Sequence, residues 1–241
     1  MLSPALAYHP SAFPPHPPAD YDDAANIIAL DQRAFDQLEH TKNHWDRPGW
    51  TTATRIVYWL LTFEPDLALA TTTRRLHRAL ARPGLDLIQP ADLHITLTRV
   101  GQRAEVTERQ TEALAKAAIG RLGPQFTLTA HPLAGSAGAI RYSVTPWRPL
   151  LLLHDTLTQL HDELHLPGGK PTVRFRPHLG VAYSNTPQAA RPLIEVVSRL
   201  RDQPPVTLHI GHVDLVELRR EPGRYVKFPP DLGQRVLTLR G

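Results

Sequence analysis

Alternation of polar and apolar residues marks two short stretches of the chain as strands that each carry a histidine. In residues 92–98 and again in residues 174–181, every second residue is polar or glycine, and those between are apolar or proline. Successive side chains of a strand point to opposite faces, so each strand has one face for a core and one polar face. The polar faces carry, in the first strand, His94, Thr96 and Thr98, and in the second, Arg174, Arg176, His178 and Gly180. Two histidines presented in this way could meet across a cleft.

Helical and strand periodicities organise the rest of the chain around these two strands. Apolar stripes at helical spacing predict five helices, at about residues 21–40, 67–81, 105–122, 150–165 and 188–200. Runs of β-forming residues predict further strands at residues 55–63, 126–130, 140–145, 206–210, 214–219, 225–228 and 236–239.

This order of elements occurs twice. In each half a strand, a helix, a histidine strand, a second helix and a strand follow one another, and each histidine lies 13 residues after the end of the helix before it. Identity between the halves is slight, so the repeat is one of organisation. Strands that follow one another directly do not fit a doubly wound parallel sheet. The pattern predicts an α+β protein of two pseudo-symmetric lobes, with largely antiparallel sheets and flanking helices around a central cleft.

Three regions are expected along the chain. Residues 1–20 form a proline-rich tail, either mobile or draped over the surface, because six prolines exclude a helix or central strand. Residues 21–54 form an extension of one helix and a tryptophan-rich loop, and residues 55–241 form the bilobal domain. In the loop, Trp45 and Trp50 are interpreted first as anchors of the extension, and second as contacts for a substrate.

Composition narrows the class of protein only slightly. Lys+Arg 27 against Asp+Glu 23 gives a net charge of +4, which mildly favours anionic ligands such as phosphates. The absence of cysteine excludes thiol catalysis and thiolate metal sites and fits a reducing cytoplasm. The longest apolar stretch, Ile56–Leu61, is far shorter than the about 20 residues of a membrane span, and no secretory signal pattern is present. We expect a soluble cytoplasmic protein with no membrane segment and no obligate protein partner.

Two histidines on opposite sides of a phosphorus atom can divide the work of an in-line displacement. One takes a proton from the attacking water or hydroxyl, and the other gives a proton to the departing ribose oxygen. A hydroxyl two residues on, as Thr96 is from His94, can hold a phosphoryl oxygen while negative charge moves onto it. This chemistry needs no metal ion and no cofactor, and we expect neither.

Residues His94–Leu97 resemble the first His-x-Thr-x signature of the 2H phosphoesterase superfamily, which includes the 2′-5′ RNA ligase-like proteins and RNA 2′,3′-cyclic phosphodiesterases. Residues 176–183, with His178, resemble the second signature, and the resemblance runs from about Arg55 to the C-terminus. It implies a bilobal fold with both histidines in a central cleft. It also implies metal-independent hydrolysis of 2′,3′-cyclic phosphates of RNA or a nucleotide, and in some members reversible 2′-5′ ligation. By the same resemblance, His94 is the acid and His178 the base during hydrolysis.

One position departs from the second signature. Gly180 stands where the family has Thr or Ser, so the second strand supplies no hydroxyl. Three consequences are open: the bare backbone admits a bulkier phosphate, Arg174 or Arg176 holds the phosphoryl oxygen, or the site is impaired. The loss of one hydrogen bond to a developing oxyanion costs about 3–4 kcal/mol. An enzyme is therefore the first hypothesis, and a catalytically weak or inactive protein that binds RNA or nucleotide phosphates is the second.

A third hypothesis, a metal-dependent hydrolase, rests on two groups of side chains at helical spacing. They are His154, His161 and His165 in one helix, and Asp36, His40 and His44 near the end of another. Neither group has a full ligand signature such as His-Glu-x-x-His, so both are interpreted as polar helix faces.

Two further features concern the faces of strands. Arg141, Ser143 and Thr145 alternate on a strand equivalent to the one at residues 55–63, and one of them would line the cleft. Continued alternation beyond His178 places Tyr183 on the opposite face, in the core.

Overall fold

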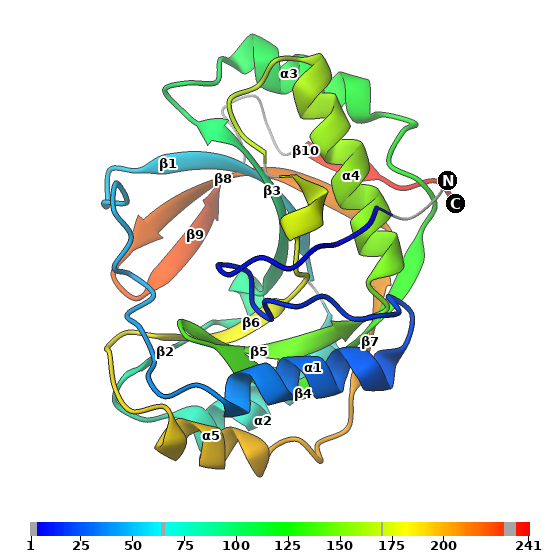
Figure 1. Ribbon diagram of the computed structural model, residues 1–241. Coiled ribbons are helices and arrows are strands. Elements are labelled where there is room, and N and C mark those ends of the chain that lie inside the picture. Colours follow the sequence, from blue (N-terminus) through cyan, green and yellow to red (C-terminus); the bar gives the residue numbers. More distant parts are fainter. Residues whose placement is uncertain (1–3, 64–65, 170, 229–234) are drawn as a thin grey trace.

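Two antiparallel sheets, each of five strands, build the part of the chain that the structure describes (Figure 1). The computed structural model describes residues 4–63, 66–169, 171–228 and 235–241. The first sheet has the order β10-β8-β1-β3, with β9 paired to β8: β1 Arg55–Thr62, β3 His94–Gln102, β8 His212–Glu221, β9 Arg224–Phe228 and β10 Arg235–Thr238. The second has the order β2-β6-β5-β4-β7: β2 Leu85–Leu87, β4 Phe126–Ser136, β5 Ala139–Thr145, β6 Leu179–Ser184 and β7 Val206–Ile210.

The helices are exchanged between the two sheets. They are α1 Ala24–Asp36, α2 Leu67–Leu80, α3 Glu108–Ala118, α4 Arg148–Glu163 and α5 Arg191–Ser198. Helix α2 follows β1 of the first sheet but packs with α5 on the second, whereas α4 follows β5 of the second sheet and packs with α3 on the first (Figure 1). Each lobe therefore contains elements from both halves of the chain. Helix α1 lies along β4 and β5.

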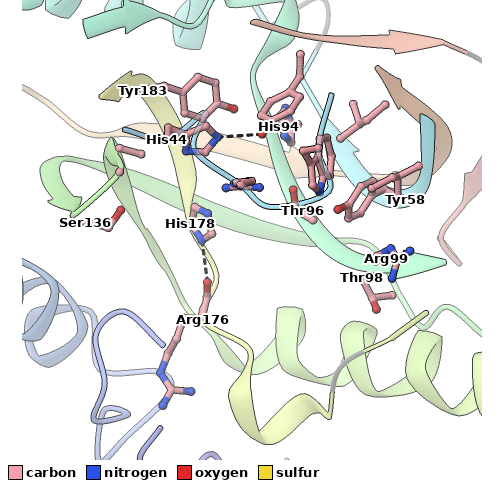
Figure 2. A pocket seen from close by; sticks show the side chains of 18 of the residues that line it. His44, Tyr58, His94, Thr96, Thr98, Arg99, Ser136, Arg176, His178 and Tyr183 are labelled. Atoms are coloured by element: carbon pink, nitrogen blue, oxygen red, sulfur yellow. Dashed lines mark hydrogen bonds between the residues drawn. The ribbon is translucent and has the colours of Figure 1, made fainter. Parts of the chain in front are cut away.

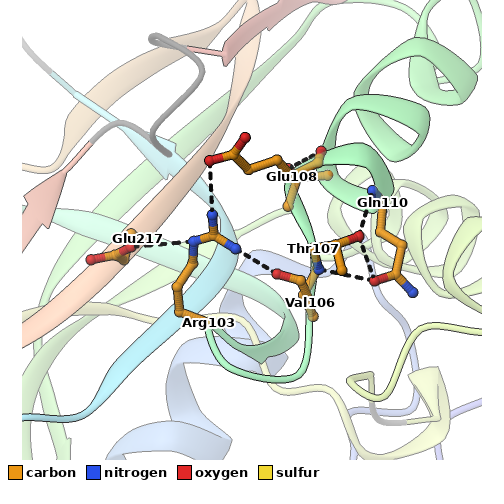
Figure 3. Close-up of polar contacts among 7 residues, drawn as sticks. Arg103, Val106, Thr107, Glu108, Gln110 and Glu217 are labelled. Atoms are coloured by element: carbon orange, nitrogen blue, oxygen red, sulfur yellow. Dashed lines mark hydrogen bonds and ion pairs between the residues drawn. The ribbon is translucent and has the colours of Figure 1, made fainter.

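Local hydrogen bonds set where the helices begin. The Asp23 side chain accepts from the N–H of Asn26 at the start of α1, and that of Asp66 accepts from the N–H of Leu69 in α2. Thr107 and the side chain of Gln110 form a capping box at α3 (Figure 3). These bonds satisfy main-chain donors that the first turn of a helix leaves without partners.

Arg103 joins the start of α3 to the first sheet. Its guanidinium donates to the main-chain oxygen of Val106 at 2.6 Å and forms ion pairs with Glu108 at 3.4 Å and Glu217 of β8 at 4.0 Å (Figure 3). Glu217 is buried, so its charge needs such a partner. The contacts tie the chain just after β3 to β8, which lies on the other side of β1 in the sheet.

The apolar faces of the two histidine strands lie in the core, as the alternation predicts. Leu93 and Ile95 of the first, and Leu179 of the second, belong to one continuous cluster with the fully buried Trp59 and Tyr142. Burial of this apolar surface is the main force that orients the opposite, polar faces toward the cleft.

The N-terminal segment crosses the molecule between the two lobes (Figure 1). Residues 4–18 contain no helix or strand, and Leu6 packs with Ile27, Trp147 and Leu151 in a small apolar cluster.

All five predicted helices are present, with ends displaced by up to four residues, but the second histidine strand differs from the prediction. Residues Thr172–Arg174 form a 3-10 turn, and β6 begins only at Leu179. Pro171 and Pro177 lack the N–H that a ladder needs, which explains why the strand does not reach further back. The short strand β2 was not predicted. Among the described residues, no helix is long and apolar enough to cross a membrane.

Candidate active site

A cleft of about 800 Å³ lies between the two lobes and is partly walled by the N-terminal segments. All seven residues singled out in the sequence line it: His94, Thr96, Thr98, Arg174, Arg176, His178 and Gly180. Residues 11–13 of the tail and several residues of the tryptophan-rich loop line it as well. The extension is therefore part of the cleft wall.

The two histidines are held in the same way. Nδ1 of His94 lies 2.7 Å from the main-chain oxygen of Asp92. Nδ1 of His178 lies 2.9 Å from the main-chain oxygen of Arg176 (Figure 2). A carbonyl oxygen can only accept, so Nδ1 carries the proton in each neutral ring and Nε2 carries the lone pair. Each histidine thus has its orientation fixed through one nitrogen and the other left for proton exchange.

Matching β-bulges give the two strands the same local shape. Leu97 is the extra residue in β3 and Val181 the extra residue in β6, each three positions after its histidine. Side chains beyond a bulge change faces. The simple alternation that places Tyr183 opposite His178 is therefore incomplete: Tyr183 is buried but lines the cleft.

Burial lowers the pKa of both histidines. For His178 the pKa falls to about 4, first because protein surrounds the ring and next because of the charge of Arg141. The ring is nevertheless accessible from the cleft. For His94 the pKa is also lowered, chiefly by burial, against the opposing hydrogen bond to Asp92. The charge of His94, which lines the same cleft, is a smaller cause of the lowered pKa of His178.

The two hydroxyls of β3 differ in their surroundings. Thr96 is half-buried and faces the cleft beside His94 (Figure 2). Thr98 is 4% exposed, and its hydroxyl has no hydrogen-bond partner among the described residues. Thr98 follows the Leu97 bulge, so its side chain is on the buried face of β3, and its hydroxyl is not exposed to the cleft as that of Thr96 is.

Arg176 has a different function from the one expected. Its guanidinium points away from His178 toward the tail (Figure 2), and it is 5% exposed. It donates to the main-chain oxygens of Ala7, Pro14 and Pro15 in the tail, and to those of Val173 and Phe175. These bonds occupy its donors, so we correct the expectation that Arg176 holds a phosphoryl oxygen. Arg174 is exposed at the edge of the cleft.

A third histidine lies in the cleft, and no pattern in the sequence predicts it there. His44 stacks on Tyr183 with ring centroids 4.0 Å apart, and its Nε2 lies 3.1 Å from the hydroxyl of Tyr225. Burial, then the charge of Arg47, lowers its pKa to about 2. His44 is therefore neutral at physiological pH and is a polar aromatic wall of the cleft.

The two tryptophans of the loop have different surroundings. Trp45 is buried, and its Nε1 donates to Asp86 at 2.7 Å, which makes it an anchor. Trp50 is half-buried and lines the cleft, with its ring 5.5 Å from that of Tyr225 and the Arg47 guanidinium 5.9 Å from its centre. The anchor interpretation fits Trp45, and the contact interpretation fits the position of Trp50.

Arg141 of β5 is a second buried cation of the cleft. It is 3% exposed and forms an ion pair of 2.9 Å with Asp31 of α1, itself 1% exposed. Its guanidinium lies 5.3 Å from the ring centre of Phe13 in the tail. Burial raises the pKa of Asp31, and the charge of Arg141 opposes that shift.

The two groups considered as metal ligands do not converge. His154 is buried, bonded to Thr172 at 2.9 Å and stacked on Phe175, while both ring nitrogens of His161 have no partner in the described structure. Across residues 4–63, 66–169, 171–228 and 235–241, no three His, Cys, Asp or Glu side chains are arranged to hold a metal ion.

Two antiparallel lobes with one histidine from each in a shared cleft define the fold of the 2H phosphoesterases. The family model of the 2′-5′ RNA ligase superfamily matches residues 63–222, more than half of the chain, and the protein belongs to this superfamily. Comparison with curated proteins found no match.

Solved structures share the fold at low sequence identity. TT0787 of Thermus thermophilus is 20% identical with a TM-score of 0.57, and covers 77% of this chain and 98% of its own. LigT of E. coli in apo form is 17% identical with a TM-score of 0.56, and covers 78% of this chain and 99% of its own. Almost the whole of each neighbour is matched, whereas about a fifth of this chain is not.

Proposed function

We propose that this protein is a metal-independent phosphodiesterase that hydrolyses a 2′,3′-cyclic phosphate at an RNA end or on a nucleotide. The observation that carries the proposal is the matched pair of histidines, each with Nδ1 bonded to the main-chain oxygen two residues before it. This arrangement leaves two Nε2 atoms in one cleft to exchange protons with a substrate.

His178 is the base and His94 the acid during hydrolysis. Nε2 of His178 takes a proton from water, whose oxygen forms a bond to phosphorus while the bond from phosphorus to O3′ breaks. Nε2 of His94 gives its proton to O3′, and the product carries a 2′-phosphate and a free 3′-hydroxyl. Thr96 donates its hydroxyl to a non-bridging oxygen as negative charge grows there. When a ribose 5′-hydroxyl takes the place of water, the same step joins its oxygen to phosphorus and forms a 2′-5′ linkage. In the reverse of that step the two histidines exchange roles: His94 takes the proton of the 3′-hydroxyl, His178 gives a proton to the departing 5′-oxygen, and the cyclic phosphate forms again.

The low pKa of each histidine suits these roles once substrate is bound. At neutral pH, His178 with a pKa of about 4 is unprotonated and ready to accept. The negative phosphate raises the pKa of a neighbouring imidazole, which brings the His94 pKa back toward neutrality. The bound phosphate therefore favours the protonated form of His94, and the leaving oxygen of the same substrate then accepts that proton.

The cleft walls support a nucleotide as the substrate. Trp50, Tyr58 and Tyr225 supply aromatic surfaces and Arg47 a cation beside them. Bases stack on aromatic side chains at about 1–3 kcal/mol each. Structures of E. coli LigT include complexes with 3′-AMP, with ATP and with phosphate.

The proposal is tested with an oligonucleotide that ends in a 2′,3′-cyclic phosphate, in buffer with EDTA. We expect turnover by the wild type and a loss of about 10²–10⁴-fold in each of His94→Ala and His178→Ala. His209→Ala is the matched control, because this histidine is exposed on β7 and lies outside the residues that line the cleft. Turnover that is unchanged in the two cleft variants contradicts the proposal.

The second candidate function is binding of RNA or nucleotide phosphates without turnover. Gly180 favours it, because the second strand brings no hydroxyl to the cleft. It predicts salt-sensitive binding of the same oligonucleotide and no product.

A further inference from the structure

The group that faces Gly180 is an arginine, and its position is set by the pseudo-symmetry of the lobes. In the first lobe Thr96 pairs with Leu60 of β1 just before the bulge, and in the second lobe Gly180 pairs with Arg141 of β5 just before the matching bulge. At this position the first lobe has a hydroxyl next to an apolar residue. The second lobe has a glycine, without a side chain, next to a cation.

Space and donors are both present at this position. A Cβ on residue 180 would have one neighbour within 4 Å, Cδ1 of Ile88 at 2.9 Å, so the side chain's place is otherwise open. Arg141 lines the same cleft. One of its terminal nitrogens is bonded to Asp31, but its buried Nε has no partner in the described part of the chain. An arginine with donors left over beside an open space suits a bound anion.

We propose that Arg141 is the phosphate-binding residue of the second lobe and replaces the hydroxyl missing at Gly180, with Asp31 as its positioning residue. This rests on the proposed function. The guanidinium donates charge-assisted hydrogen bonds to the phosphoryl oxygen on the His178 side, as Thr96 does on the His94 side. A fixed cation there stabilises the charge that grows on the oxygen in the transition state.

The support for Arg141 comes from the N-terminal extension. Asp31 lies in α1, and Phe13, whose ring faces the guanidinium, lies in the tail. Both precede residue 63, where the family match begins. The neighbours are matched over 98–99% of their length but cover only 77–78% of this chain. The extension therefore holds Arg141 in position through Asp31 and Phe13. In this proposal Arg141 binds the phosphoryl oxygen that a hydroxyl binds in other members of the family.

A double-mutant cycle between Arg141 and Gly180 tests the proposal. Arg141→Met keeps the length of the stem but removes the donors, and we expect kcat to fall about 10²–10³-fold with a smaller change in KM. Gly180→Thr restores the hydroxyl, because Ile88 Cδ1 is the end of a flexible side chain and can move. In the Arg141→Met protein, Gly180→Thr should raise kcat at least tenfold. In the wild-type protein the same change should raise kcat much less. Arg141→Lys should lie between Met and wild type.

Folding is controlled separately, because Arg141→Met leaves Asp31 buried without its partner. The variant Asp31→Asn with Arg141→Met removes both charges, and the effect of Gly180→Thr on kcat is measured again in it after thermal melting shows a folded protein. A merely structural arginine predicts equal losses from Asp31→Asn and Arg141→Met and no recovery by Gly180→Thr. Absence of recovery in folded protein overturns the proposal.

Binding of inorganic phosphate separates this proposal from the proposed function. If no cyclic phosphate is turned over, the proposed function fails, yet phosphate titrations still test Arg141. We expect the dissociation constant for inorganic phosphate to rise at least tenfold in Arg141→Met. Adding Gly180→Thr to that variant should lower the constant part of the way back to the wild-type value. An unchanged constant overturns the proposal even if the wild type is active, and His94→Ala, which should lose turnover while it retains phosphate binding, confirms that the two readouts are independent.

Discussion

The Nδ1–H of His178 donates to the main-chain oxygen of Arg176 at 2.9 Å, and the side chain of that same arginine holds the N-terminal tail. One residue thus orients a histidine of the cleft with its backbone and closes one wall of the cleft with its guanidinium. The tail and the site are mechanically connected at this point.

Arg176→Met should therefore release the tail. Several carbonyl oxygens lose a charged donor, and we expect the free energy of unfolding to fall by about 3 kcal/mol. Urea unfolding measures the loss, and limited proteolysis measures cleavage within residues 4–18. Arg174→Met is the matched control, because Arg174 is exposed two residues away. A tail that stays protected in the Arg176 variant would show that other contacts dock it.

The pH profile of kcat/KM follows from the two histidines. Activity of the free enzyme needs neutral His178, which is lost as pH falls through about 4. It also needs protonated His94, whose pKa lies below the ordinary 6.5, so that activity falls as pH rises through that lowered value. We expect a bell-shaped profile with its maximum on the acidic side of neutrality. The kcat profile should extend to higher pH, because bound phosphate raises the pKa of His94.

His44 supplies the control for this profile. Its pKa of about 2 keeps it neutral over the whole range, so His44→Gln should leave the alkaline limb where it is. A shift of that limb in His44→Gln would mean that His44, rather than His94, titrates there.

The two tryptophans of the loop should separate binding from stability. Trp50→Ala removes an aromatic wall of the cleft, and we expect KM for a cyclic nucleotide to rise about tenfold, in line with about 1–3 kcal/mol for a stacked base. Trp45→Ala should instead lower the free energy of unfolding by about 3–5 kcal/mol, because it empties a buried site. Steady-state kinetics and urea unfolding of both variants check the contrast. Equal effects of the two changes on KM would argue against a base-binding role for Trp50.

Periodicity in the sequence was enough to predict the frame of the molecule. The five helices, the first histidine strand and the core faces of both histidine segments depend on local patterns, and the repeat of these patterns predicts two lobes. The second strand is shorter than predicted and begins only at Leu179. The position of His94 and His178 in one cleft follows from that repeat.

The parts of the site that were not predicted depend on residues distant in sequence. Whether Leu97 and Val181 bulge depends on the register with β1 and β5, which alternation within one strand does not contain. Arg176 bonds to Pro14 across 162 positions, and Arg141 to Asp31 across 110. In the sequence, Arg176 beside His178 predicts a phosphate ligand. The sequence pattern does not show that the N-terminal tail occupies the donors of this arginine. Only the register shows that Arg141, and not Arg176, faces Gly180.

Gly168 is the position where a single methyl group should disturb the fold most directly. It lies in the loop after α4, and a Cβ there would overlap the main-chain oxygens of Arg99 and Val100 in β3. Arg99 pairs with Tyr58 of β1 and Val100 is the residue skipped in the register beside it, so a shift of this backbone disturbs the pairing of β3 with β1. Gly168→Ala should therefore cost at least about 1–3 kcal/mol of unfolding free energy and displace the strand that carries Thr96 and Thr98. Gly211→Ala is the control, since the nearest atom to a Cβ there lies at 3.8 Å. If urea unfolding gives the two variants the same stability, the loop is free to move away from β3, and the close approach of Gly168 is not a requirement of the fold.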